Sequence, residues 1–315
     1  MLAFAVDRFG EPGSVRELPT PEPEDGEVLV RVRAAGVNAV DPWVVHGALK
    51  DMMEHRFPLI PGVEASGVVE ALGSGVDGHA VGDEVFGVAV KPFFGEGTFA
   101  ELVTLPAVGI ARKPSSVDHV SAAALPHTAL TAFTAIDEVD PREGQVVLVV
   151  GATGGVGSFV TQLAAHRGAR VVAVARGEYA EYAQELGASE TIDYQTGDLV
   201  DLVRSGHPEG LDSIIDLFGD GPTLTRLSEL VGAGGWVVST GGAADLDVLA
   251  QRGLQGGNVN RASPERLAEL TRLVDEQRLL VPPTRVYHLE EVGEALAEME
   301  GRHVRGKLVI SVEPA

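Results

Sequence analysis

The chain of 315 residues contains no cysteine, and this absence excludes several kinds of chemistry. Without thiols there is no disulfide framework, no thiolate nucleophile and no thiolate ligand for a metal ion. No apolar run approaches the ~18 residues that a membrane-spanning helix needs. The first residues acquire charge at Asp7 and Arg8, too early for a secretory signal peptide. These absences predict a soluble, cytoplasmic protein that does not associate with a membrane.

Basic residues are also scarce. The 24 Lys and Arg residues face 46 Asp and Glu residues, so the formal net charge is −22. A field of this sign repels nucleic acid and anionic membrane surfaces, and no basic stripe offsets it. We therefore expect no nucleic-acid partner, and a small molecule as the substrate. At about 150 residues per domain, the length predicts two domains.

The most informative feature present is a glycine-rich turn within residues 145–158. A run of apolar and β-branched residues enters the turn, and a helical pattern follows it. A strand, a tight glycine turn and a helix N-terminus in this order bind a pyrophosphate through backbone N–H groups and the helix dipole. The pattern predicts a dinucleotide site made by Gly151, Ala152, Thr153, Gly154, Gly155, Val156 and Gly157. Alanine stands at residue 152, where the usual pattern has its first glycine.

The end of the next strand indicates which dinucleotide binds. An NAD site places Asp or Glu there to accept a hydrogen bond from the ribose 2′-hydroxyl. This chain has Arg176 instead, after a strand over residues 169–175. A guanidinium can bind a 2′-phosphate through two parallel hydrogen bonds. Arg176 therefore favours NADPH over NADH, although Glu178 nearby could screen a merely solvent-exposed arginine.

The pattern of expected strands and helices divides the chain into three parts. Residues 1–118 are rich in β patterns, with candidate strands at 28–34, 68–72 and 84–88. Residues 119–262 alternate strands and helices, which predicts βαβ crossovers and a doubly wound parallel sheet of the α/β class. Residues 263–315 return to the first domain as two helices and a last strand. The nucleotide domain is thus expected to interrupt a discontinuous catalytic domain.

Several motifs in a fixed order resemble one family. The chain is similar to the medium-chain dehydrogenase/reductase superfamily, and within it to the zinc-free NADPH:quinone oxidoreductase (zeta-crystallin-like) branch. The resemblance covers about 300 residues. The matching segments are residues 35–41, 58–69, 81–87, 95–101, 123–132, 152–157 and 306–309. It implies a Rossmann domain for NADPH and a β-rich GroES-like catalytic domain.

The resemblance also makes the missing cysteines informative. Zinc-dependent members carry Cys where Asn38 stands and His where Val63 stands. Neither replacement can complete a tetrahedral zinc site of nitrogen and sulfur ligands, so we expect no metal. Without a Lewis acid, an alkoxide is not stabilised during alcohol oxidation. The substrates expected are compounds that already accept a hydride, namely quinones and α,β-unsaturated carbonyl compounds.

Residue roles follow from the same resemblance. Asn38 and Asp41 are expected beside the nicotinamide and the substrate, although both residue types also serve local turns. The candidate catalytic set is Asn38, Asp41 and His46. Further cofactor contacts are expected from Thr128, Thr131, Tyr194 and Gly241, with Tyr194 near the adenosine 2′-phosphate. Tyr194 could equally be a half-buried tyrosine at a strand end.

The chain departs from the family at two aromatic positions. Leu49 stands where relatives often have a tyrosine, which in related enoyl-thioester reductases is the proposed proton donor, and Trp43 stands where tyrosine is common. Leu49 cannot donate a proton. His46 and, less strongly, His127 are the nearby groups that could. We expect solvent to supply the proton, because quinone reduction yields oxygen anions that water protonates readily.

Two other functions stay open, an enoyl reductase that tailors a polyketide or similar metabolite, and an NADPH-binding protein without turnover. The substrate depends on residues 42–57 and 243–262, whose shape the sequence does not give. The resemblance implies a homodimer joined through the nucleotide domains. Candidate edge elements are residues 235–239 and 246–248, because an unpaired strand edge is protected when a second copy pairs with it.

Overall fold

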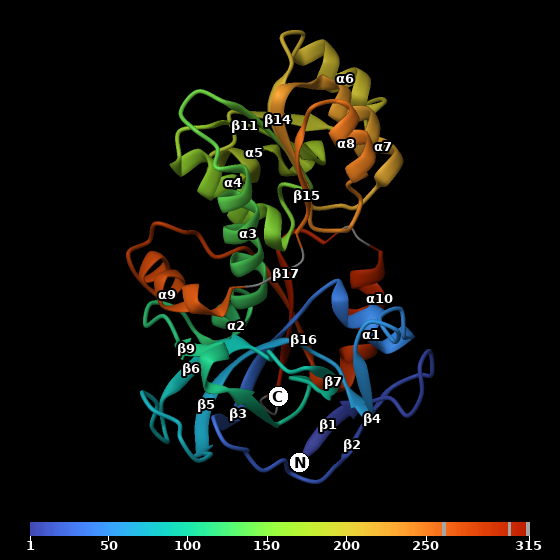
Figure 1. The fold of residues 1–315 in the computed structure, drawn as a ribbon. Helices are drawn as coiled ribbons and strands as arrows, with labels where there is room; N and C mark the ends of the chain where they lie inside the picture. Colours follow the sequence, from blue (N-terminus) through green and yellow to red (C-terminus); the bar gives the residue numbers. More distant parts are fainter. Residues whose placement is uncertain (260–262, 302–303, 313–315) are drawn as a thin grey trace. The chain divides into compact units, whose positions relative to one another are not determined.

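The computed structural model describes residues 1–259, 263–301 and 304–312. The chain folds into two compact units (Figure 1). One comprises Met1–His127 together with Pro264–Ala315, and the other comprises Thr128–Ser263. We call them the catalytic unit and the nucleotide unit.

The catalytic unit is built on a sheet with strand order β16-β17-β3-β5-β6-β9, and β8 also pairs with β3. Two short sheets, β1-β2 and β4-β7, lie outside this order. Its strands are β1 (Leu2–Ala5), β2 (Ser14–Glu17), β3 (Glu27–Val37), β4 (Glu54–Ile60), β5 (Glu64–Leu72), β6 (Glu84–Val88), β7 (Phe93–Glu96), β8 (Leu102–Pro106), β9 (Ile110–Arg112), β16 (Thr284–His288) and β17 (Lys307–Ser311). Its helices are α1 (Val40–His46), α2 (His119–Ala123), α9 (Leu267–Asp275) and α10 (Val292–Glu300).

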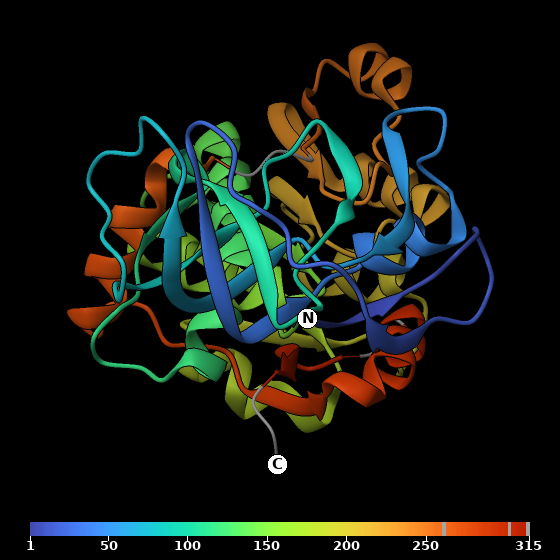
Figure 2. The ribbon, with the colours of Figure 1, turned by 90° about the horizontal axis from the view of Figure 1, so that it is seen from below.

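Strand β3 organises this unit. It pairs antiparallel with β5, β8 and β17, and thereby joins the two ends of the chain, blue and red in Figure 2. Its middle, from Val30 to Ala34, alternates buried residues with more exposed ones, as the sequence predicts in part, whereas its last four residues are all buried. This end is covered because α2 packs against β3 and β5, with Ala123 and Ala124 against Ala34.

The nucleotide unit contains one parallel sheet with strand order β12-β11-β10-β13-β14-β15. Its strands are β10 (Val146–Val150), β11 (Arg170–Ala175), β12 (Glu190–Asp193), β13 (Leu211–Asp216), β14 (Val231–Ser239) and β15 (Gln255–Asn258). Helix α3 (Pro126–Val139) leads into this unit. The other helices are α4 (Gly155–His166), α5 (Ala180–Glu185), α6 (Leu199–Gly206), α7 (Gly221–Leu227) and α8 (Leu246–Gln251). The expected doubly wound α/β fold is confirmed.

The strand order in this parallel sheet reverses between β10 and β13. From β10 the chain runs outward through β11 to β12, and then from β13 outward through β14 to β15. Right-handed crossovers therefore cover both faces of the sheet with helices. In open α/β sheets, ligands bind at the carboxyl ends of the strands, at the point where the order reverses. The carboxyl ends of β10 and β13, at Val150 and Asp216, mark that point.

The boundary between the units differs from the one predicted at residues 118 and 119. The catalytic unit continues to His127. The reason is local: Asp118 caps α2 by accepting a hydrogen bond from the Ser121 amide, and α2 then packs on β3 and β5 of the catalytic sheet. The first helix after residue 118 therefore still belongs to the catalytic unit.

The predicted edge elements of the nucleotide sheet are wrong. Residues 235–239 belong to β14, which is paired on both sides by β13 and β15, and residues 246–248 open helix α8. The sheet ends instead at β15 and β12 among the described residues. The segment 243–262, on which the substrate was expected to depend, contains helix α8 and strand β15. Its residues 260–262 lie outside the described part of the chain.

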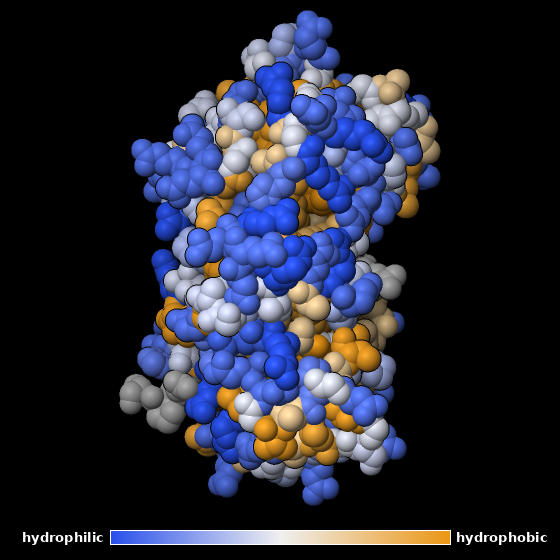
Figure 3. All heavy atoms as spheres, turned by 90° about the vertical axis from the view of Figure 1, so that its left-hand side faces the viewer, coloured by the Kyte–Doolittle hydropathy of each residue, from blue (hydrophilic) through white to orange (hydrophobic). Residues whose placement is uncertain are grey.

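Hydrophilic side chains predominate on the face drawn in Figure 3, as the acidic composition leads one to expect. Apolar residues are collected inside, in a cluster around Phe99 and Leu59 in the catalytic unit and one around Ile214 and Leu148 in the nucleotide unit. Within the described residues, no helix is both long and apolar enough to cross a membrane.

Candidate active site

The glycine turn lies between β10 and α4, at the carboxyl end of its strand. Gly151 has a φ of +84°, which only glycine adopts without strain. A Cβ on Gly157 would lie 2.1 Å from the Gly151 carbonyl oxygen, so the first turn of α4 packs directly on the backbone that precedes it. No side chain caps α4 at Gly154, which leaves its first N–H groups available for an anion.

Arg176 and Tyr194 come together at the ends of the next two strands. Arg176 follows β11 and Tyr194 follows β12, and Arg176 Nε donates a hydrogen bond of 3.2 Å to the Tyr194 hydroxyl. Glu178 lies 3.6 Å from the same guanidinium. Sequence reasoning missed Asp193, whose carboxylate oxygen would lie 2.6 Å from a Cβ on Gly177. The signal for it was an acidic residue at the end of the strand beside β11.

The remaining expected cofactor residues lie in the same unit. Thr128 and Thr131 are buried on α3, at 3% and 7% exposure. Gly241 lies in the loop after β14, where a Cβ would approach the Cα of Gly219 to 2.8 Å. The turn at 151–157, Arg176, Tyr194 and Gly241 therefore all follow the carboxyl ends of parallel strands.

The catalytic unit holds a second polar group, buried around Asn38 at the end of β3. Asn38 Nδ2 donates to Glu64 Oε1 at 2.8 Å, and Asn38 Oδ1 accepts from the Lys307 ammonium. Lys307 and Glu64 also form an ion pair of 2.7 Å. All three side chains are at most 5% exposed, so both polar atoms of the Asn38 amide are engaged inside the protein.

Asp41 lies one turn further, at the start of α1. Its Oδ2 accepts a 2.7 Å hydrogen bond from the Asn38 backbone N–H. Burial raises the pKa of Asp41 from 3.8 to about 7, against the lowering effect of the Asn38 N–H and of Lys307. Asp41 Oδ1 has no hydrogen-bond partner among the described residues. It lines a cavity of about 20 Å³, a space the size of one water molecule.

The two histidines differ in environment. His46, on α1, is about half exposed, and its Nε2 lies 2.7 Å from Glu300 Oε1 on α10. The His127 backbone N–H donates to Glu64 Oε2 at 2.7 Å. Burial lowers the pKa of the His127 ring, which keeps it neutral at pH 7. Leu49 packs against the catalytic core, and Trp43 is 38% exposed.

Known proteins match the chain over nearly its whole length. Residues 24–115 match the Alcohol dehydrogenase GroES-like domain family, and residues 186–310 match the family described as Zinc-binding dehydrogenase. The chain is 31% identical to NAD(P)H oxidoreductase RTN4IP1, mitochondrial, of Mus musculus, over 99% of this chain and 89% of that one. It is 30% identical to the NADPH-dependent alkenal/one oxidoreductase, chloroplastic, of Arabidopsis thaliana, over 92% of this chain and 73% of that one.

A solved structure agrees with these matches. The quinone oxidoreductase from Coxiella burnetii superposes with a TM-score of 0.88 over 99% of both chains, at 30% identity. The chain belongs to the medium-chain dehydrogenase/reductase superfamily. The expected pairing of a Rossmann domain with a GroES-like domain is thereby confirmed, as is an oxidoreductase that uses a nicotinamide cofactor.

Zinc is implied by the description of one matched family, but the residues of this superfamily member do not fit the ion. Val63 offers no ligand atom, and the amide of Asn38 is already bonded to Glu64 and Lys307. Within the described part of the chain, no three His, Asp or Glu side chains are grouped so that they could hold a metal.

Sequence reasoning missed Glu64 and Lys307. Each is the charged first residue of a strand, β5 or β17, and mostly apolar residues follow it. A charge in such a run is rarely buried unless it is paired. The signal was therefore visible in two separate motifs, but nothing in the sequence showed that the two motifs meet.

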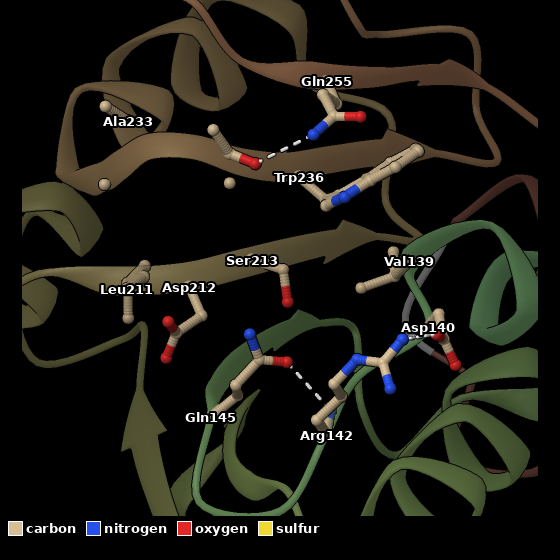
Figure 4. A pocket seen from close by; sticks show the side chains of 13 residues that line it. Val139, Asp140, Arg142, Gln145, Leu211, Asp212, Ser213, Ala233, Trp236 and Gln255 are labelled. Carbon is tan, nitrogen blue, oxygen red and sulfur yellow. Dashed lines mark hydrogen bonds and ion pairs between the residues drawn. The ribbon is translucent and has the colours of Figure 1, made fainter.

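A cavity of about 460 Å³ lies in the nucleotide unit at the opposite edge of the sheet. It is lined by Ser213 on β13, Trp236 on β14, and Gln145 and Arg142 of the loop before β10, and the Ser213 side chain points toward Gln145 (Figure 4). These are the amino ends of the strands, whereas dinucleotides bind at the carboxyl ends. We therefore do not assign this cavity to the cofactor.

Proposed function

We propose that the protein is an NADPH-dependent reductase that transfers a hydride to quinones or α,β-unsaturated carbonyl compounds without a metal. The observation that carries the proposal is the engagement of Asn38 by Glu64 and Lys307 at a position where zinc-dependent relatives place a ligand. Without a Lewis acid the site has no means to stabilise an alkoxide. Conjugated acceptors need none, because the developing charge is delocalised onto their oxygen.

NADPH, and not only a nicotinamide cofactor, is supported by the contact between Arg176 and Tyr194. The two side chains would hold the 2′-phosphate by a charge-assisted bond and a hydroxyl hydrogen bond. Glu178 and Asp193 oppose this preference, because their carboxylates repel a phosphate at short range. We propose that the guanidinium prevails, since a carboxylate cannot donate a hydrogen bond to the phosphate.

When bound, NADPH supplies the hydride, and the protein holds the cofactor and acceptor in a reactive geometry. Asn38 and Asp41 are proposed to shape the substrate pocket through their backbone, since their side chains bond within the protein. His46 is bonded to Glu300 on the surface of α10, and Leu49 has no proton to give. Solvent is therefore the proposed source of the proton.

A homodimer and a cytoplasmic location remain proposals. The edge of the nucleotide sheet at β15 is the place where a second copy could pair and protect the open strand. One relative carries the word mitochondrial in its name, so the cytoplasmic location of this chain is a proposal only. Light scattering at micromolar concentration tests the assembly, and a monomeric mass contradicts it.

The function is tested by following NADPH consumption with a panel of quinones and simple enones, and NADP⁺ reduction with a panel of alcohols. The proposal expects turnover with quinones or enones and none with NADP⁺ and alcohols. Turnover with a single elaborate enone would point to a tailoring enoyl reductase. NADPH binding without turnover on any acceptor would contradict the enzymatic function and leave a binding protein.

A further inference from the structure

Three polar side chains stand at the carboxyl ends of β13, β14 and β15. They are Asp216, Ser239 and Asn258, each the last residue of its strand. The corresponding ends of β10 and β11 are apolar, at Val150 and Ala175. Asp216 and Ser239 are only 2% and 0% exposed. Burying a carboxylate is costly unless it is hydrogen-bonded. The hydrogen bonds of Asp216 and Ser239 therefore show what these two side chains hold in place.

The hydrogen bonds of Asp216 all go to loop backbone or to Ser239. Its carboxylate accepts from the N–H groups of Phe218 at 3.2 Å and Gly219 at 3.1 Å, which shapes the loop after β13. It also accepts from the Ser239 hydroxyl at 2.7 Å. Burial raises the pKa of Asp216, and these donors act in the opposite direction.

Ser239 and Asn258 fix the loop after β14. The Ser239 oxygen accepts from the N–H groups of Gly241 and Ala243, both at 3.2 Å. Asn258 accepts from the Ala244 N–H at 3.0 Å and donates to the Ala244 carbonyl at 3.1 Å. The loop over residues 240–245 is therefore tied to β14 and β15 by these two side chains, and the Thr240 N–H also donates to the Asp216 carbonyl of β13 at 2.9 Å.

The two loops also touch each other through glycine backbone. A Cβ on Gly219 would lie 3.3 Å from the Gly241 Cα, and Gly219 has a φ of +82°. No side chain at Gly219 or Gly241 separates the loops, so a shift in one is transmitted directly to the other. The position of the two loops relative to each other depends on Asp216 and Ser239, because these side chains are hydrogen-bonded to the backbone of both loops.

Doubly wound sheets bind dinucleotides in two halves, one on each side of the point where the strand order reverses. The glycine turn, Arg176 and Tyr194 all belong to the half made by β10, β11 and β12. We infer that Asp216 and Ser239, assisted by Asn258, are positioning residues that hold the loops 217–220 and 240–245 in the shape that binds the nicotinamide half of the cofactor. This inference rests on the proposed binding of NADPH along the carboxyl edge.

The inferred role of Asp216 and Ser239 concerns only the nicotinamide half of NADPH. Binding measurements with a ligand that lacks this half can therefore test it. Adenosine 2′,5′-bisphosphate carries the adenosine, the 2′-phosphate and one 5′-phosphate, but no nicotinamide. Dissociation constants for it and for NADPH are measured by calorimetry on the wild-type chain, Asp216→Asn and Ser239→Ala. Asp212→Asn is the matched control, because Asp212 lies on the same strand and accepts from a backbone N–H, that of Val146, at the opposite edge.

Asp216→Asn and Ser239→Ala are each expected to raise the dissociation constant of NADPH about tenfold, because each variant disrupts the charge-assisted hydrogen bonds that hold the two loops. Binding of adenosine 2′,5′-bisphosphate should stay within about twofold, and the control should change neither constant. The KM for NADPH should rise while kcat at saturating NADPH falls less. Such a split is not expected from a general loss of stability.

The inference is overturned if the variants bind NADPH and adenosine 2′,5′-bisphosphate equally more weakly, or if they bind both ligands as tightly as the wild type. If Asp216→Asn does not fold, Ser239→Ala carries the same test, because it removes the relay to Gly241 and leaves the carboxylate in place. A wild-type chain that binds adenosine 2′,5′-bisphosphate and NADPH, with unchanged variants, contradicts the inference alone. A wild-type chain that binds neither ligand contradicts the proposed function as well.

Discussion

Lys307 and Glu64 form an ion pair of 2.7 Å between side chains that are 2% and 0% exposed. The pair joins β17, near one end of the chain, to β5, near the other. Glu64 also accepts from Asn38 and from the His127 backbone N–H, so its charge is fully compensated. The network fixes four segments of the catalytic unit around one buried carboxylate.

Removing one partner should therefore be costly. Lys307→Met leaves an uncompensated buried carboxylate, and we expect the free energy of unfolding to fall by about 3–5 kcal/mol in urea titrations. The double variant Lys307→Met, Glu64→Gln should lose less than the sum of the two single losses. Arg272→Met is the control, because the pair of Arg272 with Glu276 is exposed and should cost less than about 1 kcal/mol. Additive losses in the double variant would contradict a coupled pair.

Asp41 should make stability depend on pH. Its pKa rises from 3.8 to about 7 on folding because it is buried. Between these values the folded state keeps a proton that the unfolded state has lost, so stability falls as the pH rises. Relative to the wild type, Asp41→Asn should gain up to about 4 kcal/mol of unfolding free energy between pH 4 and pH 7. Parallel pH profiles for the two proteins would show that Asp41 ionises as readily as in water.

Arg176→Ala should weaken NADPH about tenfold or more, through loss of a charge-assisted contact. NADH, which lacks the 2′-phosphate, should bind with nearly unchanged affinity. Tyr194→Phe removes only the hydroxyl that Arg176 contacts, and a smaller effect in the same direction is expected. The check is the ratio of the two dissociation constants in each protein. A wild type that binds NADPH and NADH equally would refute the preference.

His46→Ala should lower turnover by less than about tenfold, well below the 10²–10⁴-fold loss expected for a general acid. The reason is that His46 bonds to Glu300 on the protein surface. Asn38→Ala should cost more, because the network with Glu64 and Lys307 would lose its central amide. Steady-state kinetics on one quinone and one enone compare the variants. Abolished turnover in His46→Ala with intact NADPH binding would identify the histidine as the acid.

Sequence patterns predicted the elements whose periodicity is strong. Strand β6 begins and ends at the predicted residues, and β11 ends at the predicted residue and begins one residue later, because both are largely apolar runs bounded by turn residues. Strand β15 was missed because its residues, Gln255–Asn258, include two glycines and no β-branched residue. Its pairing with β14 is imposed by tertiary context, which propensity does not contain.

In the candidate site too, the sequence predicted the features that depend on local patterns and missed those that depend on distant residues. The glycine turn and Arg176 were visible because strand, turn and helix are adjacent in the sequence. The network of Asn38 with Lys307 was not, because 269 residues separate the two and no local pattern joins them. For the same reason the sequence placed His46 near the chemistry, whereas its partner Glu300 lies on a helix near the other end of the chain.

The most direct test of the account follows the hydride itself. Protein stripped of metal by a chelator is given NADPH carrying deuterium at the reactive C4 position, together with a simple enone and, separately, a quinone. The account predicts unchanged turnover after metal removal, and a reduced enone with deuterium on the carbon β to the carbonyl. A reduced enone without deuterium, or activity on either acceptor that disappears with the metal and returns with zinc, would contradict metal-free hydride transfer.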